Sequence, residues 1–172
     1  MIDYDLKKIK AIVFDVDGVL SCEKISLGSD GQPRRSVNIK DGYALQLAIN
    51  RGLVVAIITG ASVKELEIRY RNLGINEIFL GCRVKLEVFR NLLKKYCLQP
   101  EEVAYMGDDI PDYEIMKESG LPCCPADAAT EIKGISKYVS SRKGGEGCAR
   151  DLIGQILKAQ DLWIMDNVAF GW

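Results

Sequence analysis

The sequence contains no histidine among its 172 residues. This absence excludes Ser-His and Cys-His nucleophile pairs and histidine-ligated zinc, so proton transfer is left to carboxylates, lysine, tyrosine or water. No apolar run approaches the roughly 20 residues that a membrane span needs, and residues 1–10 are too polar for a signal peptide. We therefore expect a cytoplasmic protein without a membrane partner.

An excess of charge of either sign is also missing. The chain has 23 basic and 24 acidic residues, a balance that gives no indication of nucleic acid as a partner. The six cysteines form no C-x-x-C pair, which favours reduced thiols. The length predicts one domain, residues 1–160, with a full hydrophobic core, followed by a tail at 161–172 that contains both tryptophans and has no clear period.

The most informative stretch is residues 11–20, AIVFDVDGVL. It begins with four apolar residues, as in a strand buried on both faces, and continues with Asp15, Asp17 and Gly18. Alternating strand geometry sends the two carboxylates to the same side, where they repel each other unless they share a cation. The alternative is a helix-capping aspartate followed by a turn.

Strand-like and helix-like segments alternate along the rest of the chain. Strands are expected at residues 53–58, 77–80, 103–106, 121–125 and 138–139. Helices are expected after Asp41, which would cap the first, and at residues 62–73, 85–96, 113–118 and 126–133; Ser62 and Glu65 form a capping-box pattern. A last amphipathic helix carries Leu152, Ile153, Ile156 and Leu157. This order predicts an α/β, Rossmann-like parallel sheet with helices on both faces, and a β-hairpin insertion at about residues 22–37.

Polar residues follow each of the first four strands: Asp15 and Asp17, Thr59-Gly60, Lys85, and Gly107-Asp108-Asp109. In parallel sheets, ligands bind beyond the carboxyl ends of the strands. If the strands are neighbours, carboxylates, a hydroxyl and an amine meet in one crevice, and oxygen ligands of this kind favour Mg²⁺ beside a site for an anion.

At this point the sequence resembles the haloacid dehalogenase-like phosphatases. Their four motifs occur in order as Asp15-x-Asp17-Gly18, Thr59-Gly60, Lys85 and Gly107-Asp108-Asp109-x-x-Asp112. The resemblance implies that Asp15 is the nucleophile that forms an aspartyl-phosphate, and that Asp17 first protonates the leaving alcohol and then activates water.

The same resemblance implies where the ligands bind. Mg²⁺ would lie on the carboxylates of Asp15 and Asp108 and the backbone carbonyl of Asp17. Thr59 and the Gly60 backbone would hold the phosphoryl oxygens, and Lys85 would bridge phosphate and nucleophile. Asp109 and Asp112 would support these residues or cap the following helix. The spacings between the motifs leave no room for a cap domain.

Within the superfamily, the sequence resembles the 3-deoxy-D-manno-octulosonate 8-phosphate phosphatases from about residue 9 to 160. Shared features are the FDVDGVL start, Asp41-Gly42, Arg69, the stretch 125–128 and the glycine-rich loop 144–147. The resemblance implies a homotetramer with active sites at subunit interfaces, Arg69 reaching a neighbour's crevice, and a role in synthesis of the lipopolysaccharide inner core. The substrate-binding residues it implies are Asp17, Asn38, Lys40, Asp41, Gly42, Thr59, Gly60, Arg69 and Lys85.

Two positions depart from this family, and two alternatives stay open. Ala61 stands where the family has arginine after Thr-Gly, which removes a bidentate carboxylate contact, and Val84 stands where it has aspartate. A phosphatase for a nine-carbon 2-keto-3-deoxy sugar acid 9-phosphate is the first alternative. The second is a receiver-like phosphoacceptor domain, in which the third strand ends in aspartate, whereas this one ends in Leu80-Gly81.

Overall fold

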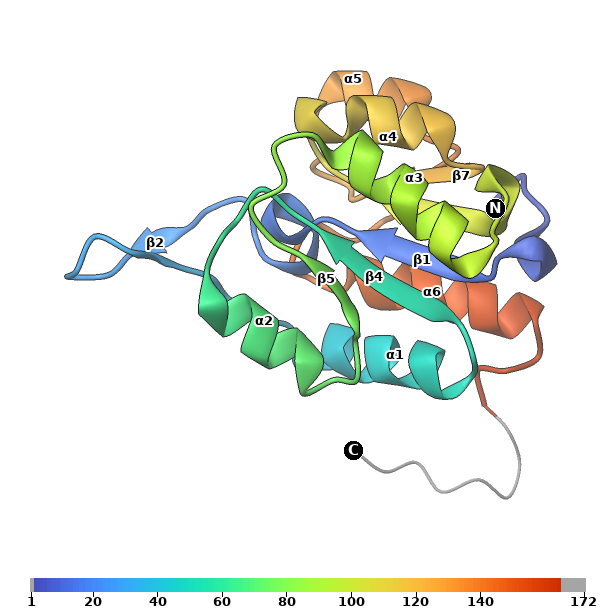
Figure 1. Cartoon of the computed structure of the whole chain (residues 1–172), viewed down its shortest axis with the longest axis horizontal. Helices are drawn as coiled ribbons and strands as arrows, with labels where there is room; N and C mark the ends of the chain where they lie inside the picture. Colours follow the sequence, from blue (N-terminus) through green and yellow to red (C-terminus); the bar gives the residue numbers. More distant parts are fainter. Residues whose placement is uncertain (1, 165–172) are drawn as a thin grey trace.

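The computed structural model describes residues 2–164, which form a three-layer α/β/α arrangement around a parallel sheet (Figure 1). The sheet has six strands in the order β5-β4-β1-β6-β7-β8, and every neighbouring pair is parallel. The strands are β1 (Ala11–Phe14), β4 (Val54–Ile58), β5 (Glu77–Phe79), β6 (Val103–Met106), β7 (Leu121–Cys124) and β8 (Tyr138–Val139). The predicted parallel, Rossmann-like sheet is confirmed.

Helices cover both faces of the sheet. They are α1 (Ile39–Asn50), α2 (Lys64–Arg71), α3 (Lys85–Tyr96), α4 (Tyr113–Glu118), α5 (Thr130–Ile135) and α6 (Cys148–Ala159). Figure 1 shows α1, α2 and α6 on one face and α3, α4 and α5 on the other. Alternate residues of β1 enter separate cores: Ile12 and Phe14 pack toward α1 and α6, and Ala11 and Val13 pack toward α3. The all-apolar strand runs follow from burial on both faces.

The predicted hairpin is present between β1 and α1. Its strands are β2 (Ser26–Leu27) and β3 (Pro33–Arg34), which pair antiparallel with each other. The hairpin projects from the edge of the domain near α2 (Figure 1), and Arg34 forms an exposed ion pair with Asp30 at 2.6 Å. The segment from β3 to α1 brings Arg35 back to the carboxyl edge of the sheet, where it meets Asp17.

Three predicted helix boundaries are wrong. The α1 helix is capped by Asn38, whose side chain accepts the N–H groups of Lys40 and Asp41, so Asp41 lies inside the helix. The N-cap residue of α2 is Val63, whose side chain makes no cap hydrogen bond, so the expected capping box at Ser62 is not formed. The α5 helix begins at Thr130, because residues 126–129 form a turn instead of helix.

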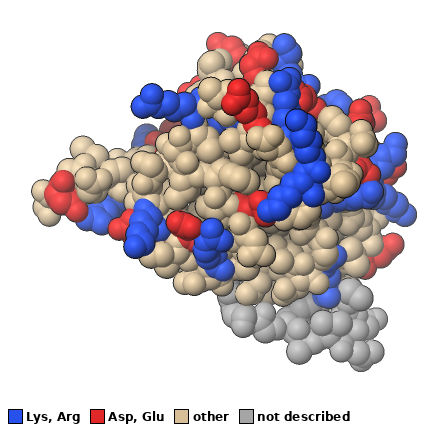
Figure 2. All heavy atoms as spheres, viewed as in Figure 1, with Lys and Arg blue, Asp and Glu red and all other residues tan. Residues whose placement is uncertain are grey.

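The first residues of the predicted tail fold back onto the domain. Arg51 donates to the carbonyl of Leu162, and the Trp163 ring lies 5.0 Å from the Arg150 guanidinium. The remainder of the tail, with the second tryptophan, lies outside the described residues. No helix within residues 2–164 is long and apolar enough to cross a membrane. On the face drawn in Figure 2, basic and acidic side chains are interspersed.

Candidate active site

The strand order brings the predicted site residues together at the carboxyl edge of the sheet. The central strand β1 lies between β4 and β6, and Phe14 is level with both Ile57 and Met106. The residues that follow these three strands therefore emerge side by side. The backbone N–H of Asp15 still donates to the carbonyl of Met106 at 3.1 Å, which fixes the start of the site rigidly to the sheet.

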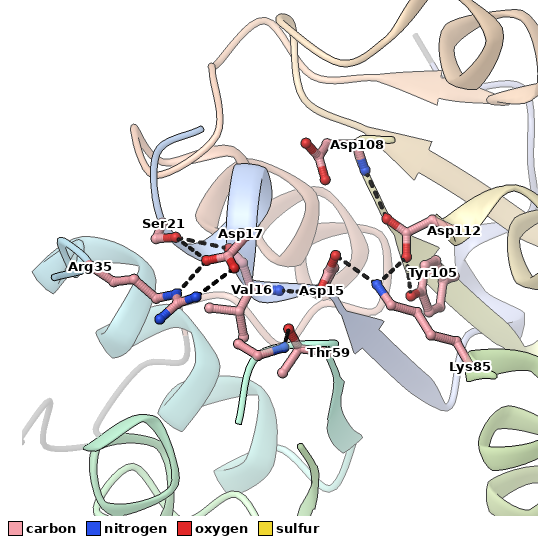
Figure 3. Close-up of polar contacts among 11 residues, drawn as sticks. Asp15, Val16, Asp17, Ser21, Arg35, Thr59, Lys85, Tyr105, Asp108 and Asp112 are labelled. Carbon is pink, nitrogen blue, oxygen red and sulfur yellow. Dashed lines mark hydrogen bonds and ion pairs between the residues drawn. The ribbon is translucent and has the colours of Figure 1, made fainter. Parts of the chain in front are cut away.

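Asp15 and Lys85 form a buried ion pair at the centre of this edge (Figure 3). Lys85 Nζ lies 2.7 Å from Asp15 Oδ2 and 2.7 Å from Asp112 Oδ1. The backbone N–H of Val16 donates to the other Asp15 oxygen at 2.7 Å. Both carboxylates are thus held on one ammonium group, and the orientation of Asp15 is fixed from two sides.

Asp112 holds Lys85 and the backbone of Asp108 in place through hydrogen bonds. Its Oδ1 accepts hydrogen bonds from Lys85 and from the hydroxyl of Tyr105, the latter at 2.7 Å, and its Oδ2 accepts the backbone N–H of Asp108. These contacts place Asp112 against Lys85 and the backbone of Asp108, and its supporting role stays a prediction. The role of Tyr105 was not predicted, because a tyrosine within an apolar strand is typical of a hydrophobic core. Tyr105 is fully buried on β6. Asp109, by contrast, is exposed and caps nothing with its side chain.

Asp108 provides the carboxylate that is free to bind a cation. Within residues 2–164 no donor bonds to its side-chain oxygens, whereas both oxygens of Asp15 and of Asp112 are engaged. Oxygens of Asp15, Asp108 and Asp112 lie within 4.8 Å of one another. A donor set of carboxylates without histidine or cysteine fits a hard divalent cation such as Mg²⁺.

The backbone in front of Asp108 leaves no space for a larger residue. Gly18 has a φ of +75°, and a Cβ at this position would lie 1.9 Å from Asp108 Oδ2. Glycine is therefore required here both for its conformation and for the close approach of the aspartate.

The electrostatics also call for a cation. Burial and then the charge of Asp112 raise the pKa of Asp15 to about 6, although Lys85 acts in the opposite direction. Burial and the charges of Asp112 and Asp15 raise the pKa of Asp108 to about 7. Burial disfavours the ammonium of Lys85, but Asp112 and Asp15 outweigh it and raise its pKa. Three carboxylates around one ammonium leave an excess of negative charge that a divalent cation would balance.

Thr59 and Gly60 lie at the end of β4, as predicted. Thr59 is buried, and its hydroxyl accepts the N–H of Ala61 at 3.2 Å. Within residues 2–164 the hydroxyl donates to no acceptor, so its proton can face a ligand. Gly60 is exposed, and the nearest atom to a Cβ built there is 3.9 Å away. This turn is open toward the crevice and offers N–H and O–H donors to an anion.

Asp17 has a partner that sequence reasoning missed. Arg35 donates from Nε to Asp17 Oδ1 at 2.5 Å and from Nη2 to Asp17 Oδ2 at 2.8 Å. Ser21 adds a weaker hydrogen bond to Oδ1 at 3.3 Å. In Figure 3 the Asp17 carboxylate points toward Arg35, while Asp15 points toward Lys85. A single arginine in a polar hairpin gave no signal that distinguishes it from a solvated one.

The predicted sugar-binding residues are spread over a wider area. Asp41 is buried and accepts the backbone N–H of Arg150 at 2.7 Å, and Asn38 donates to the carbonyl of Gly145, so both brace the fold. Lys40 lines a separate hollow beside α6. Arg69 lies against Gly42 of its own chain, with a buried Nε that has no partner within residues 2–164.

Two cavities of about 470 Å³ flank the Asp17–Arg35 pair. One contains Asp15, Asp17 and Asp108. The other lies between the hairpin and α2 and is lined by residues that include Arg35 and Arg69. An acidic cavity suited to a metal and a phosphate thus adjoins one that offers arginines to a further part of the ligand.

Comparison with known proteins agrees with this geometry. Residues 84–152 match the haloacid dehalogenase-like hydrolase family. The 3-deoxy-D-manno-octulosonate 8-phosphate phosphatase of Yersinia pestis is 40% identical over 153 residues, covering 89% of this chain and 82% of the relative. A crystal structure of the Yersinia pestis phosphatase superposes with a TM-score of 0.89 at 38% identity, covering 92% of this chain and 86% of that one.

A second solved structure is the corresponding phosphatase from Moraxella catarrhalis, in complex with magnesium, phosphate and the sugar acid. It superposes with a TM-score of 0.88 at 34% identity, covering 92% of this chain and 91% of that one.

Proposed function

The chain belongs to the 3-deoxy-D-manno-octulosonate 8-phosphate phosphatases among the haloacid dehalogenase-like hydrolases, and on this premise we propose that it hydrolyses this sugar phosphate to the free sugar acid and phosphate. The observation that carries the proposal is the Asp15–Lys85–Asp112 arrangement beside the free carboxylate of Asp108. It supplies a nucleophile and a cation site at one sheet edge. The reaction belongs to synthesis of the lipopolysaccharide inner core.

Asp15 is the nucleophile in this proposal. One of its carboxylate oxygens attacks phosphorus, the bond between phosphorus and the sugar oxygen breaks, and an aspartyl-phosphate forms. Lys85 and the Val16 N–H hold the carboxylate in place before the attack. Thr59 and Gly60 donate to the phosphoryl oxygens, and Lys85 offsets part of the charge that collects there.

Asp17 transfers the protons. As an acid it protonates the departing sugar oxygen, and as a base it then takes a proton from the water that displaces Asp15 from phosphorus. Mg²⁺ would be held by the carboxylates of Asp15 and Asp108 and by the backbone carbonyl of Asp17, where it offsets the negative charge of nucleophile and phosphate. Asp112 keeps Lys85 and Asp108 in position through its hydrogen bonds.

The cavity between the hairpin and α2 supports a sugar acid as substrate, since Arg34 and Arg69 are among its lining residues, while the guanidinium of Arg35 is already paired with Asp17. A nine-carbon sugar acid 9-phosphate is the second candidate, and Ala61 is the observation that favours it. Restoring the missing arginine in Ala61→Arg should lower KM for the octulosonate phosphate by roughly 10- to 150-fold, the value of a charged hydrogen bond, and leave an aryl phosphate unaffected.

We also propose a homotetramer in which hairpins from four subunits pack together, because the exposed strands of the hairpin leave unpaired edges. In that assembly each active site would be closed by a neighbouring subunit. We place the enzyme in a reducing compartment, the cytoplasm, because all six cysteines are free thiols.

Phosphate release from a panel of phosphate esters tests the function. The panel contains the octulosonate 8-phosphate, the nine-carbon 9-phosphate, ribose 5-phosphate and 4-nitrophenyl phosphate, each with Mg²⁺ and with excess chelator. We expect the highest kcat/KM for the octulosonate phosphate. We expect no phosphate release in excess chelator and no phosphate release by the Asp15→Asn variant. Higher kcat/KM for the nine-carbon acid would select the second candidate, and full activity in chelator would exclude the proposed mechanism.

A further inference from the structure

Arg35 is a half-buried arginine whose side chain has one hydrogen-bonding partner within residues 2–164, the carboxylate of Asp17. The side chain is only 9% exposed, and its Nη1 is buried without an acceptor. Burying a guanidinium is costly unless it is paired, so the Asp17 contact is what the chain provides for this group.

The contact restricts Asp17 more than an ordinary surface ion pair would. The planar Nε–Nη2 edge of the guanidinium meets both carboxylate oxygens, at 2.5 and 2.8 Å, and such bidentate contact fixes the plane of the carboxylate as well as its position. Ser21 alone, at 3.3 Å from Oδ1, would leave that plane free to turn. The backbone at Asp17 and Gly18 is non-helical, so no helix turn packs the side chain into one rotamer.

The pair stands between the two large cavities of the site. Asp17 lines the cavity that contains Asp15 and Asp108, whereas Arg35 lines the cavity between the hairpin and α2. A sugar phosphate that places its phosphoryl group at Asp15 and its sugar toward the hairpin would have its scissile oxygen near this boundary. Asp17 must enter this step as a carboxylic acid. Arg35 occupies one edge of its carboxyl group, so the proton for the leaving oxygen sits on an oxygen lone pair that faces away from the guanidinium.

We propose that Arg35 is a positioning residue for the reaction, which fixes the orientation from which Asp17 protonates the leaving oxygen. This inference rests on the proposed function, because it takes Asp17 as the acid. In this proposal the hairpin contributes to catalysis, because Arg35 directly follows its second strand.

A purely structural role, in which the pair only fastens the hairpin to the sheet edge, predicts a different outcome. Loss of an anchor would slow every substrate alike. Loss of positioning affects the substrates whose leaving group needs a proton. A sugar alkoxide needs one, whereas 4-nitrophenolate leaves readily without it. The dependence of the rate on the leaving group therefore separates the two roles.

The experiment measures the first turnover by rapid quench with Mg²⁺, using a sugar phosphate and 4-nitrophenyl phosphate. The variants are Arg35→Gln and Arg35→Lys, with Arg71→Gln as control, since Arg71 forms an exposed ion pair with Glu67 elsewhere. We expect Arg35→Gln to slow the sugar phosphate by roughly 10- to 100-fold, part of what a well-placed acid contributes, and the aryl phosphate by less than about threefold. Arg35→Lys should fall between, and Arg71→Gln should match wild type.

Equal losses with both substrates, or no loss with either, would overturn the proposal. A second arm uses the Asp17→Asn background, where Arg35→Gln should change the residual rate by less than about twofold, because the group that it positions is already gone. If Arg35→Gln does not fold, Arg35→Lys is used to compare the losses of rate with the sugar phosphate and with 4-nitrophenyl phosphate. If wild type rejects the octulosonate phosphate but cleaves another sugar phosphate, the proposed function fails, and the test of Arg35 proceeds with that sugar.

Discussion

Replacing Asp108 with asparagine should stabilise the metal-free protein at neutral and higher pH. Burial and neighbouring carboxylates raise the pKa of Asp108 from 3.8 to about 7. Between these two values the folded protein binds more protons than the unfolded chain, so the free energy of unfolding falls as pH rises. The variant lacks this titration. Its advantage over wild type should therefore be small at pH 4, grow up to about pH 7, and then stay constant.

The magnitude follows from the pKa shift. A rise of the pKa from 3.8 to about 7 corresponds to about 4 kcal/mol at most, and because Asp108 is partly exposed, screening by solvent reduces this to about 1–2 kcal/mol. For a chain of this length, such a change raises Tm by about 2–8 °C. Asp109→Asn, which alters the exposed neighbouring carboxylate, is the matched control and should change Tm little.

The assay is thermal unfolding in excess chelator from pH 4 to pH 8, repeated with Mg²⁺ at the upper end. Added Mg²⁺ should reverse the order, because wild type gains the free energy of cation binding whereas Asp108→Asn has lost the freest ligand. The reasoning is refuted if Asp108→Asn is no more stable than wild type at pH 8 in chelator, or if the difference between them does not shrink toward pH 4.

Three further predictions concern the support of the site. Tyr105→Phe removes a buried hydrogen bond to the Asp112 carboxylate and should lower stability by about 1.5–3 kcal/mol, measured by denaturant unfolding; an unchanged midpoint would mean that the hydroxyl contributes nothing. Gly18→Ala should weaken Mg²⁺ binding in calorimetry by at least tenfold, because its Cβ collides with Asp108, whereas Gly134→Ala, in open space, should bind as wild type does. Asp15→Asn and Arg69→Ala proteins should each be nearly inactive, and should regain activity when refolded together if Arg69 completes a neighbour's site. Mixed oligomers that form and stay inactive would show that Arg69 acts within its own chain.

The sheet could be predicted because its strands are buried on both faces. A run such as residues 11–14 has no polar member, and only a central strand of a parallel sheet needs such a run. The same logic placed Asp15 and Asp108 at one edge, since residues that follow neighbouring parallel strands meet there. Lys85 comes from the start of α3, after the more distant strand β5, and its long side chain reaches Asp15. The strand order itself was not predicted. In the structure β1 lies between β4 and β6, which makes these strands neighbours.

The features that could not be predicted from the sequence depend on contacts between segments that are distant along the chain. Asp41 looked like a helix cap, but Asn38 reaches the free N–H groups first, and Asp41 is needed by the backbone of Arg150. Arg35 carries no local pattern, because its significance lies in a partner 18 residues earlier that the hairpin brings within reach. Tyr105 fits a core strand by composition, and only the position of Asp112 gives its hydroxyl a role.

The order of strands in the sheet also determines at which stage of folding the active-site residues can come together. Residues 11–58 can pair β1 with β4 as soon as they are available, but the other side of β1 stays bare until β6 arrives from residue 103 onward. Pairing across such a long loop is slow, because closure entropy must be overcome before the contacts form. A partly folded chain in which only β1 and β4 are paired therefore has Asp15 without Lys85 anchored by Asp112 and without Asp108. The cation site is incomplete until β6 joins the sheet, so Mg²⁺ should slow unfolding of the finished domain and leave the rate of folding unchanged.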